Sequence, residues 1–221
     1  MDHQLEQQGF SLVPDVLSVS DRERLIDALQ VFKGAGRREL LGHSAVAQFA
    51  RSPRILEMVR PHLPCEPYPV RAIYFNKSPD TNWLVPWHQD LTIAVNARTD
   101  VPGFGPWSVK DGIPHVQPPT EMLDKMLTIR LHLDDCDATN GALRVLCGSH
   151  RLGLLSAERI QDLRAMLPEF VCCLSAGDAL LMRPLLLHAS ARVKDNRSRR
   201  VLHIEYAGFS LSAGLDWHEA A

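Results

Sequence analysis

The stretch Lys125-Met126-Leu127-Thr128-Ile129-Arg130-Leu131-His132-Leu133-Asp134 alternates apolar and polar side chains almost strictly. Successive side chains of a β-strand point to opposite faces, so this period of two residues predicts a strand with one face against an apolar core. Turn signals such as Asn140-Gly141 separate further short strand-like runs, at 69–77, 142–146, 171–174, 178–182 and 200–206. Many short strands without β-α-β alternation predict a double-sheet jelly roll.

The chain before residue 67 has a helical pattern instead. Ser20-Asp21-Arg22-Glu23 offers an N-cap hydroxyl and a glutamate at the capping-box position, and the helix it begins is expected to reach about Phe32. A second helix is expected from Ser52-Pro53 to the residue before Pro64, with apolar residues at Ile55, Leu56, Val59 and Leu63. We therefore predict a mainly β protein with flanking α-helices: an N-terminal helical part, about 1–66, and a double-stranded β-helix (jelly-roll, cupin-like) core, about 67–210, in one domain spanning 1–221.

Composition limits the classes of function. The chain has 221 residues, is 45% hydrophobic and carries a formal net charge of −2, with its basic residues scattered along the sequence. Without a basic stripe we expect no nucleic-acid partner, and without an apolar run of about 20 residues we expect no membrane span. The five cysteines show no Cys-x-x-Cys spacing and follow no apolar leader, so a reducing, cytoplasmic location is expected. The sequence does not indicate an oligomeric state.

Three His-x-acid tripeptides are candidates for part of a metal site: His88-Gln89-Asp90, His132-Leu133-Asp134 and His203-Ile204-Glu205. Non-haem iron(II) oxygenases bind the metal through two histidines and one carboxylate, which leaves positions open for co-substrate and dioxygen. The first tripeptide follows 83–87, where a strand would end in the mouth of a barrel with both side chains on one face. The second lies within an alternating strand, and the third is interpreted as structural. His88 and Asp90 are therefore the favoured ligands.

The third ligand is predicted to be His188, near the end of the very apolar run 183–190. Arg199 follows eleven residues later and begins the next strand of a predicted hairpin, so both side chains could face one cavity. A guanidinium binds a carboxylate through two parallel hydrogen bonds and keeps its charge. Arg199 therefore fits the distal carboxylate of 2-oxoglutarate.

These residues resemble the phytanoyl-CoA dioxygenase family of 2-oxoglutarate oxygenases. The similar segments lie between about 70 and 206: Phe75-Asn76-Lys77, Pro86-Trp87-His88-Gln89-Asp90-Leu91, Leu131-His132-Leu133-Asp134-Asp135, Asn140-Gly141-Ala142-Leu143-Arg144-Val145, Gly148-Ser149-His150 and His188-Ala189-Ser190 with Arg199. The resemblance implies His88, Asp90 and His188 as ligands of Fe(2+), with Arg199 and Ser190 on the C5 carboxylate of 2-oxoglutarate. It also implies that Arg71 and Phe75 line the co-substrate site, and that a basic residue near Arg37-Arg38 approaches the C1 end.

The implied reaction is hydroxylation of a small-molecule substrate by O2, with release of succinate and CO2. Candidate substrate residues are Trp107, Gln117 and Arg130, and the long stretch 96–120, with Phe104 and Trp107, is expected to form a lid. A halogenase lacks this carboxylate, and a halide occupies the free position on the metal. Because Asp90 is present, halogenation is not expected. Two alternatives stay open: a jelly-roll metal-binding protein without oxygenase activity, and a zinc-dependent hydrolase using the same ligands.

Overall fold

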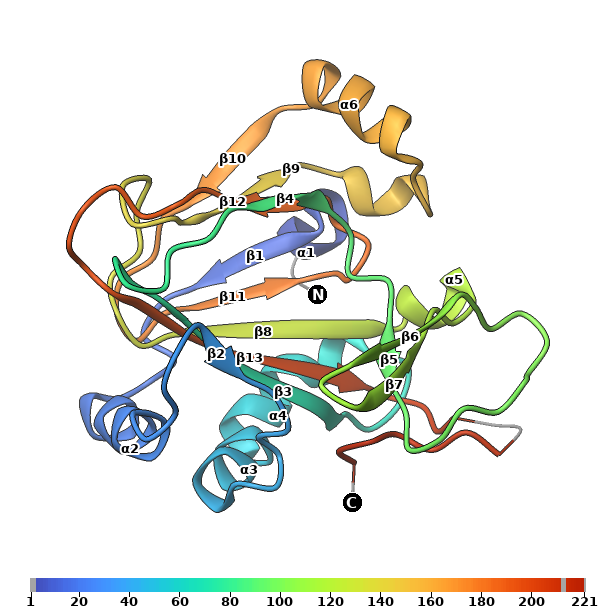
Figure 1. Ribbon diagram of the computed structural model, residues 1–221, viewed down its shortest axis with the longest axis horizontal. Helices are drawn as coiled ribbons and strands as arrows, with labels where there is room; N and C mark the ends of the chain where they lie inside the picture. Colours follow the sequence, from blue (N-terminus) through green and yellow to red (C-terminus); the bar gives the residue numbers. More distant parts are fainter. Residues whose placement is uncertain (1–2, 212–213, 221) are drawn as a thin grey trace.

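The computed structural model describes residues 3–211 and 214–220 and has two facing antiparallel sheets (Figure 1). The larger sheet has the order β1 (Phe10–Val13), β11 (Ala179–Met182), β8 (Met126–His132), β13 (Arg199–Ala207), β3 (Tyr68–Lys77) and β2 (Gly36–Arg37). The smaller sheet has the order β10 (Glu169–Cys172), β9 (Leu143–Leu146), β12 (His188–Ser190) and β4 (Val85–His88). The predicted jelly-roll core is confirmed.

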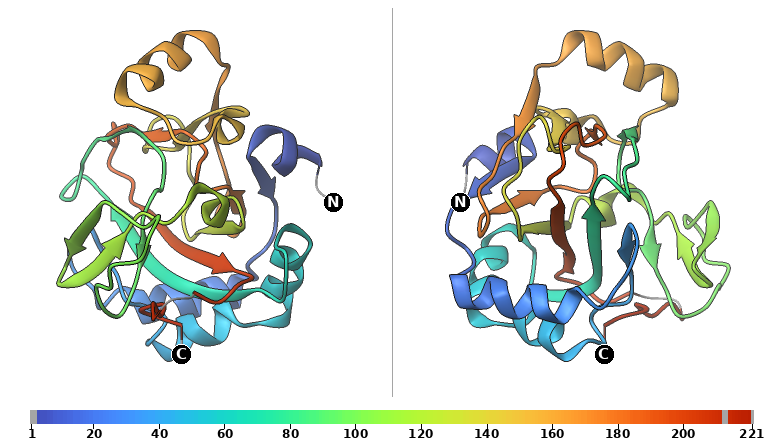
Figure 2. Two further views of the ribbon diagram at one scale, coloured as in Figure 1. Left: turned by 90° about the vertical axis from the view of Figure 1, so that its right-hand side faces the viewer. Right: turned by 60° about the vertical axis from the view of Figure 1, so that its left-hand side comes forward.

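Helices from the first third of the chain cover the outer face of the larger sheet (Figure 2). They are α2 (Val19–Leu29), α3 (Ser44–Ala50), α4 (Pro53–Val59) and the 3-10 turn Arg60–His62. Their buried side chains form one apolar cluster with the outward-facing residues of the sheet, among them Leu127, Ile129 and Leu131 of β8. The alternation in β8 therefore turns Thr128, Arg130 and His132 the other way, into the space between the two sheets.

The remaining helices lie at the edges of the sandwich. Helix α1 (His3–Gln8) precedes β1, and α5 (Thr120–Leu123) precedes β8. The 3-10 turn Ser149–Leu152 and α6 (Ala157–Met166) connect β9 to β10, and α6 lies on the far side of the smaller sheet from the other helices (Figure 2). No described helix is long and apolar enough to span a membrane.

The stretch 96–120, expected as a lid, contains most of a small third sheet. Strand β7 (Ile113–Val116) pairs with β5 (Ile93–Ala94) on one side and with β6 (Trp107–Lys110) on the other. Val95, Val116 and Leu123 are buried in the apolar cluster of this region. The stretch is therefore built around a hairpin at one end of the sandwich (Figure 1), and its apolar cluster is shared with Val70 of β3 and Met126 of β8.

Several local predictions need correction. The N-cap of α2 is Ser18, whose Oγ accepts a hydrogen bond from the backbone N–H of Asp21 at 3.1 Å. The N-cap predicted at Ser20 is therefore wrong by two residues. The strand expected at 171–174 begins earlier, at Glu169, because it pairs in register with β9. The second helix is confirmed as α4 with its 3-10 extension, whereas α1, α3, α5 and α6 were not predicted.

Candidate metal centre and co-substrate pocket

A cavity of about 330 Å³ opens between the two sheets. Its wall includes side chains of β3, β8 and β13 from the larger sheet and of β4, β9 and β12 from the smaller one. The segment that follows β4, Lys110 of the third sheet, Arg38 and Trp83 also line it. Ligand pockets in proteins have volumes of about 300–1,000 Å³, so this cavity suits a small molecule.

Two histidines and one aspartate meet in this cavity. His88 ends β4 and His188 begins β12, and the two residues are partners in the antiparallel pairing of these strands. The Nε2 atom of His88 lies 3.7 Å from Asp90 Oδ1, and Nε2 of His188 lies 3.6 Å from Asp90 Oδ2. One ligand atom from each residue lies within 4.8 Å of the others, so the three side chains could hold one metal ion. The sequence-predicted triad is thus brought together.

Hydrogen bonds fix the tautomer of both imidazoles. The Nδ1 atom of His88 lies 2.9 Å from the carbonyl oxygen of Pro86, and that of His188 lies 2.9 Å from the carbonyl oxygen of Leu186. A carbonyl can only accept, so each Nδ1 donates, and in the neutral imidazole this tautomer leaves the lone pair on Nε2. A metal-binding histidine needs this arrangement, in which the outer nitrogen is held by a neighbouring oxygen.

The electrostatics of the triad also suit a cation. Burial lowers the pKa of His188 to about 4, which keeps this imidazole neutral at physiological pH. Burial alone would raise the pKa of Asp90, but the adjacent His188, His203 and His88 lower it to about 2. The site therefore combines a carboxylate with a neutral imidazole, the forms in which these groups bind metals.

Gln89, between the two proposed ligands of this segment, also borders the cavity, and its amide group anchors the segment. Its Nε2 donates to the carbonyl oxygens of Gly153 at 2.9 Å and Leu185 at 2.8 Å, and its Oε1 accepts the amide of Leu155 at 3.1 Å. Sequence reasoning missed this role. The alternation of side chains along an extended segment is the signal, because it turns Gln89 opposite to His88 and Asp90.

Arg199 lines the same cavity and is 2% exposed. Its Nε and Nη1 atoms have no hydrogen-bond partner among the described residues. A buried guanidinium with two free donors is costly unless an anion completes it. The chain therefore fits a carboxylate-bearing ligand at this point, and Ser190, also in the cavity wall, offers a hydroxyl beside it.

Lys77 completes this cationic end of the site and was not predicted as functional. It is fully buried, pairs with Arg199 across β3 and β13, and its Nζ donates to Ser190 Oγ and to the carbonyl oxygen of Ala191, both at 2.8 Å. Burial, with Arg199 and Arg130 nearby, lowers its pKa to about 7. The available signal was its position in β3, because Lys77 is in phase with Ile73 and Phe75 of the cavity wall.

A chain of polar contacts crosses the floor of the cavity on the larger sheet. Arg71 Nη1 donates to Glu205 Oε1 at 3.1 Å, and Glu205 Oε1 lies 3.3 Å from His203 Nε2. The other ring nitrogen of His203 lies 2.9 Å from Arg130 Nη1. The sequence led us to interpret His203 and Glu205 as structural. Both in fact line the cavity, so these contacts also shape the site.

The other sequence-predicted residues divide into two groups. Arg71, Phe75, Ser190 and Arg130 line the cavity with the triad and Arg199, but the structure does not place Trp107 and Gln117 in its wall. Trp107 and Phe104 are partly buried and pack against the apolar cluster beneath the third sheet. His132 is 1% exposed and neither ring nitrogen has a partner in the described structure, yet it is outside the triad and the cavity wall.

A jelly roll that holds two histidines and one aspartate around an open cavity defines the class of mononuclear non-haem iron(II) enzymes. The model of the phytanoyl-CoA dioxygenase family matches residues 5–201. The chain belongs to this family, so it is an iron(II)- and 2-oxoglutarate-dependent oxygenase, and the resemblance noted from the sequence is confirmed. No curated protein matches the chain.

Solved structures share the fold at low sequence identity. The non-haem α-ketoglutarate-dependent epimerase SnoN from nogalamycin biosynthesis superposes with a TM-score of 0.70 at 16% identity, covering 94% of this chain and 81% of its own. HygX from Streptomyces hygroscopicus, with nickel, 2-oxoglutarate and hygromycin B bound, gives 0.66 at 19%, covering 94% and 87%. The carbocyclase SnoK, from the same biosynthesis as SnoN, gives 0.68 at 14%, covering 99% and 85%.

Proposed function

We propose that this protein hydroxylates a small-molecule substrate, with iron(II) held by His88, Asp90 and His188 and with 2-oxoglutarate oriented by Arg199. The observation that carries the proposal is the pairing of two features in one cavity. A three-residue metal-binding cluster and a buried arginine with two free donors line the same wall. A protein that only binds a metal has no use for the second feature.

Each residue has a distinct task. The triad holds the metal from one side and leaves its other positions open to the cavity. Arg199 binds the C5 carboxylate of 2-oxoglutarate through paired hydrogen bonds, and Ser190 adds a single hydroxyl contact. Iron(II), when bound, supplies the chemistry that uses dioxygen to convert the keto acid to succinate and CO2 and to oxidise a C–H bond of the substrate. The surrounding wall excludes water from this reaction.

The choice of substrate and reaction draws on the related structures. HygX binds hygromycin B, and SnoN was crystallised with nogalamycin RO. A small molecule is therefore the proposed substrate here, and the modest cavity agrees with it. SnoN and SnoK are an epimerase and a carbocyclase. We favour hydroxylation because it needs no catalytic group beyond those of the metal and co-substrate sites.

Zinc hydrolysis uses the same kind of ligands but gives no role to Arg199. A metabolite-library screen distinguishes zinc-dependent hydrolysis from 2-oxoglutarate-dependent hydroxylation. The protein, reconstituted anaerobically with iron(II) and then supplied with oxygen and 2-oxoglutarate, is incubated with a metabolite library while succinate is measured. We expect library members that stimulate succinate formation and gain one oxygen atom by mass spectrometry, and no succinate from the zinc-loaded protein. Equal succinate with both metals contradicts the proposal.

A further inference from the structure

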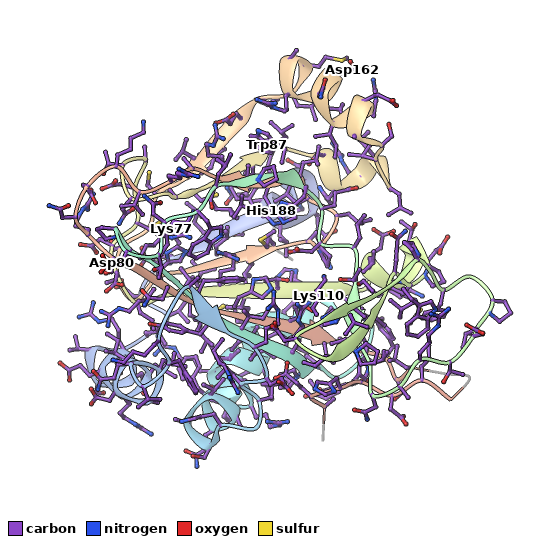
Figure 3. The ribbon with its side chains drawn as sticks, in the orientation of Figure 1. Lys77, Asp80, Trp87, Lys110, Asp162 and His188 are labelled. Atoms are coloured by element: carbon purple, nitrogen blue, oxygen red, sulfur yellow. The ribbon has the colours of Figure 1, made fainter. Side chains whose placement is uncertain are left out.

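Positive charge exceeds negative charge around the cavity. Its wall contains five basic side chains and two carboxylates: Arg38, Arg71, Lys110, Arg130 and Arg199, with Asp90 and Glu205. The basic groups lie in two places. Arg130 and Arg199 influence the pKa of Lys77, whereas Arg71 and Arg38 influence that of Lys110. In Figure 3, Lys77 and Lys110 lie on opposite sides of His188.

The proposed co-substrate, 2-oxoglutarate, gives a role only to the basic residues on the Arg199 side of the cavity. The charges of iron(II), Asp90, doubly ionised 2-oxoglutarate and Arg199 cancel one another. Arg71 is paired with Glu205 at 3.1 Å, and Arg38 is paired with Asp111. Lys110 forms no ion pair with any residue that the structure describes, and its Nζ donates instead to Thr92 Oγ1 at 2.8 Å. Among the described residues of the wall, Arg130 and Lys110 have no carboxylate partner beyond this balance; Arg130 lies with Arg199, whereas Lys110 lies with Arg71 and Arg38.

The position of Lys110 places this cation close to the metal centre. Lys110 ends β6, in the hairpin of the third sheet, and so reaches the cavity from a different element than the triad. Its partner Thr92 is two residues beyond Asp90. Lys110 is partly buried, and this burial together with the like charges of Arg71 and Arg38 lowers its pKa, whereas Asp90 and Glu205 act in the opposite direction. An anion bound here would offset both the burial and the like charges.

We infer that the primary substrate carries an anionic oxygen group, a carboxylate or a phosphate, and that Lys110 binds this group beside the metal centre. The inference rests on the proposed function, because it assigns 2-oxoglutarate to the Arg199 side. It makes Lys110 a specificity-determining residue: the ammonium fixes one end of the substrate, and the carbon to be oxidised lies toward the triad. Arg71 and Arg38 keep their own carboxylate partners and are not assigned to the substrate.

The test uses matched probes that differ in charge but hardly in shape. The protein is loaded with nickel(II), an unreactive substitute for iron, and with saturating 2-oxoglutarate, so that the Arg199 side is occupied. Phenylacetate and phenylacetamide form one pair, 3-phenylpropionate and 3-phenylpropionamide a second, and phenyl phosphate is the phosphate arm. Binding up to millimolar concentration is followed by ligand-observed NMR.

We expect at least one anion to bind wild type about tenfold or more tightly than its neutral counterpart, because a hydrogen bond between two charged groups is stronger than one to a neutral group. Phenyl phosphate is compared with phenylacetamide. Lys110→Met should reduce this preference to less than twofold, and Lys110→Arg should retain most of it. Lys125→Met, which removes an exposed lysine outside the cavity, is the matched control and should behave as wild type.

Three results overturn the inference. The first is the lack of any anion preference in wild type, including failure of all anions to bind. The second is an anion preference that survives in Lys110→Met. The third is a loss of 2-oxoglutarate binding in Lys110→Met, which would assign Lys110 to the co-substrate. Binding of 2-oxoglutarate to wild type is measured first in the same samples. Its failure counts against the proposed function and is distinct from the outcome for the anions.

Discussion

His88 and His188 face one another across the antiparallel pair of β4 and β12, with their ring centroids 4.1 Å apart. The two residues are far apart in sequence, so the pairing register of the smaller sheet brings them together. A shift of one residue in this register would turn one imidazole to the opposite face. The jelly roll therefore positions the metal site through strand pairing.

The first prediction concerns the three proposed ligands. His88→Ala, Asp90→Ala and His188→Ala should each lower the bound iron sharply, because an open-sided site has no ligand to spare. Iron is measured by elemental analysis after anaerobic reconstitution and desalting. His132→Ala, another buried histidine, is the control and should keep its iron. An Asp90→Ala protein with full iron and full turnover would exclude this carboxylate as a ligand.

Gln89 should contribute to stability without touching the metal. Gln89→Leu leaves two carbonyl oxygens and one amide without their partner, and each buried unsatisfied group costs about 1–3 kcal/mol. We expect a loss of about 2 kcal/mol or more in the free energy of unfolding, measured by urea denaturation of the metal-free protein. Gln48→Leu, at an exposed position of α3, should change it by less than about 0.5 kcal/mol. Equal stability of the two variants would contradict the role given to Gln89.

Arg199 should bind the co-substrate through its planar fork. Arg199→Lys should weaken 2-oxoglutarate about thirtyfold or more, since disrupting a buried charged contact costs about 2 kcal/mol or more. Ser190→Ala should cost about 1 kcal/mol. Calorimetric titration of the nickel(II) protein gives both affinities. Arg200→Lys is the neighbouring control, because Arg200 pairs with Asp134 outside the cavity. A larger effect at Arg200 than at Arg199 would show that the assignment is wrong.

The lowered pKa of Lys77 predicts a pH dependence of co-substrate binding. Its pKa of about 7 in the free protein means that the ammonium loses its proton as the pH rises above 7. An anion bound beside Ser190 favours the charged form, so the affinity for 2-oxoglutarate should be highest below pH 7 and fall between pH 7 and 9. Lys77→Met should have weaker binding with little change over this range. A wild-type affinity that rises with pH would contradict the prediction.

The sequence was most informative where the type of side chain and its position in the two-residue period of a strand both indicated the same role. The alternation in 125–134 predicted β8, and the motif around His88 together with His188 predicted the triad, because each signal is local. The predicted partner Arg199 lies in the cavity wall for the same reason, since it begins a strand at a fixed spacing from His188.

Signals that depend on packing were missed or misread. Trp107 was expected to contact substrate, yet it lies outside the cavity wall and is partly buried against the apolar cluster beneath the third sheet, a position that depends on the pairing of β6 with β7. Lys77 looked like an ordinary strand end, because its burial depends on the distant Ser190 and Ala191. Glu205 and His203 were taken as structural, since their contacts with Arg71 and Arg130 cross between strands.

The central claim is that one cavity binds iron(II) and 2-oxoglutarate together. Its most direct test is anaerobic titration of 2-oxoglutarate into the iron(II) protein, followed by visible absorption. We predict a weak metal-to-ligand charge-transfer band that saturates with the keto acid in wild type, needs much more keto acid in Arg199→Lys, and is absent with zinc(II). A wild-type protein that holds iron at the triad but develops no band at saturating 2-oxoglutarate would contradict the claim.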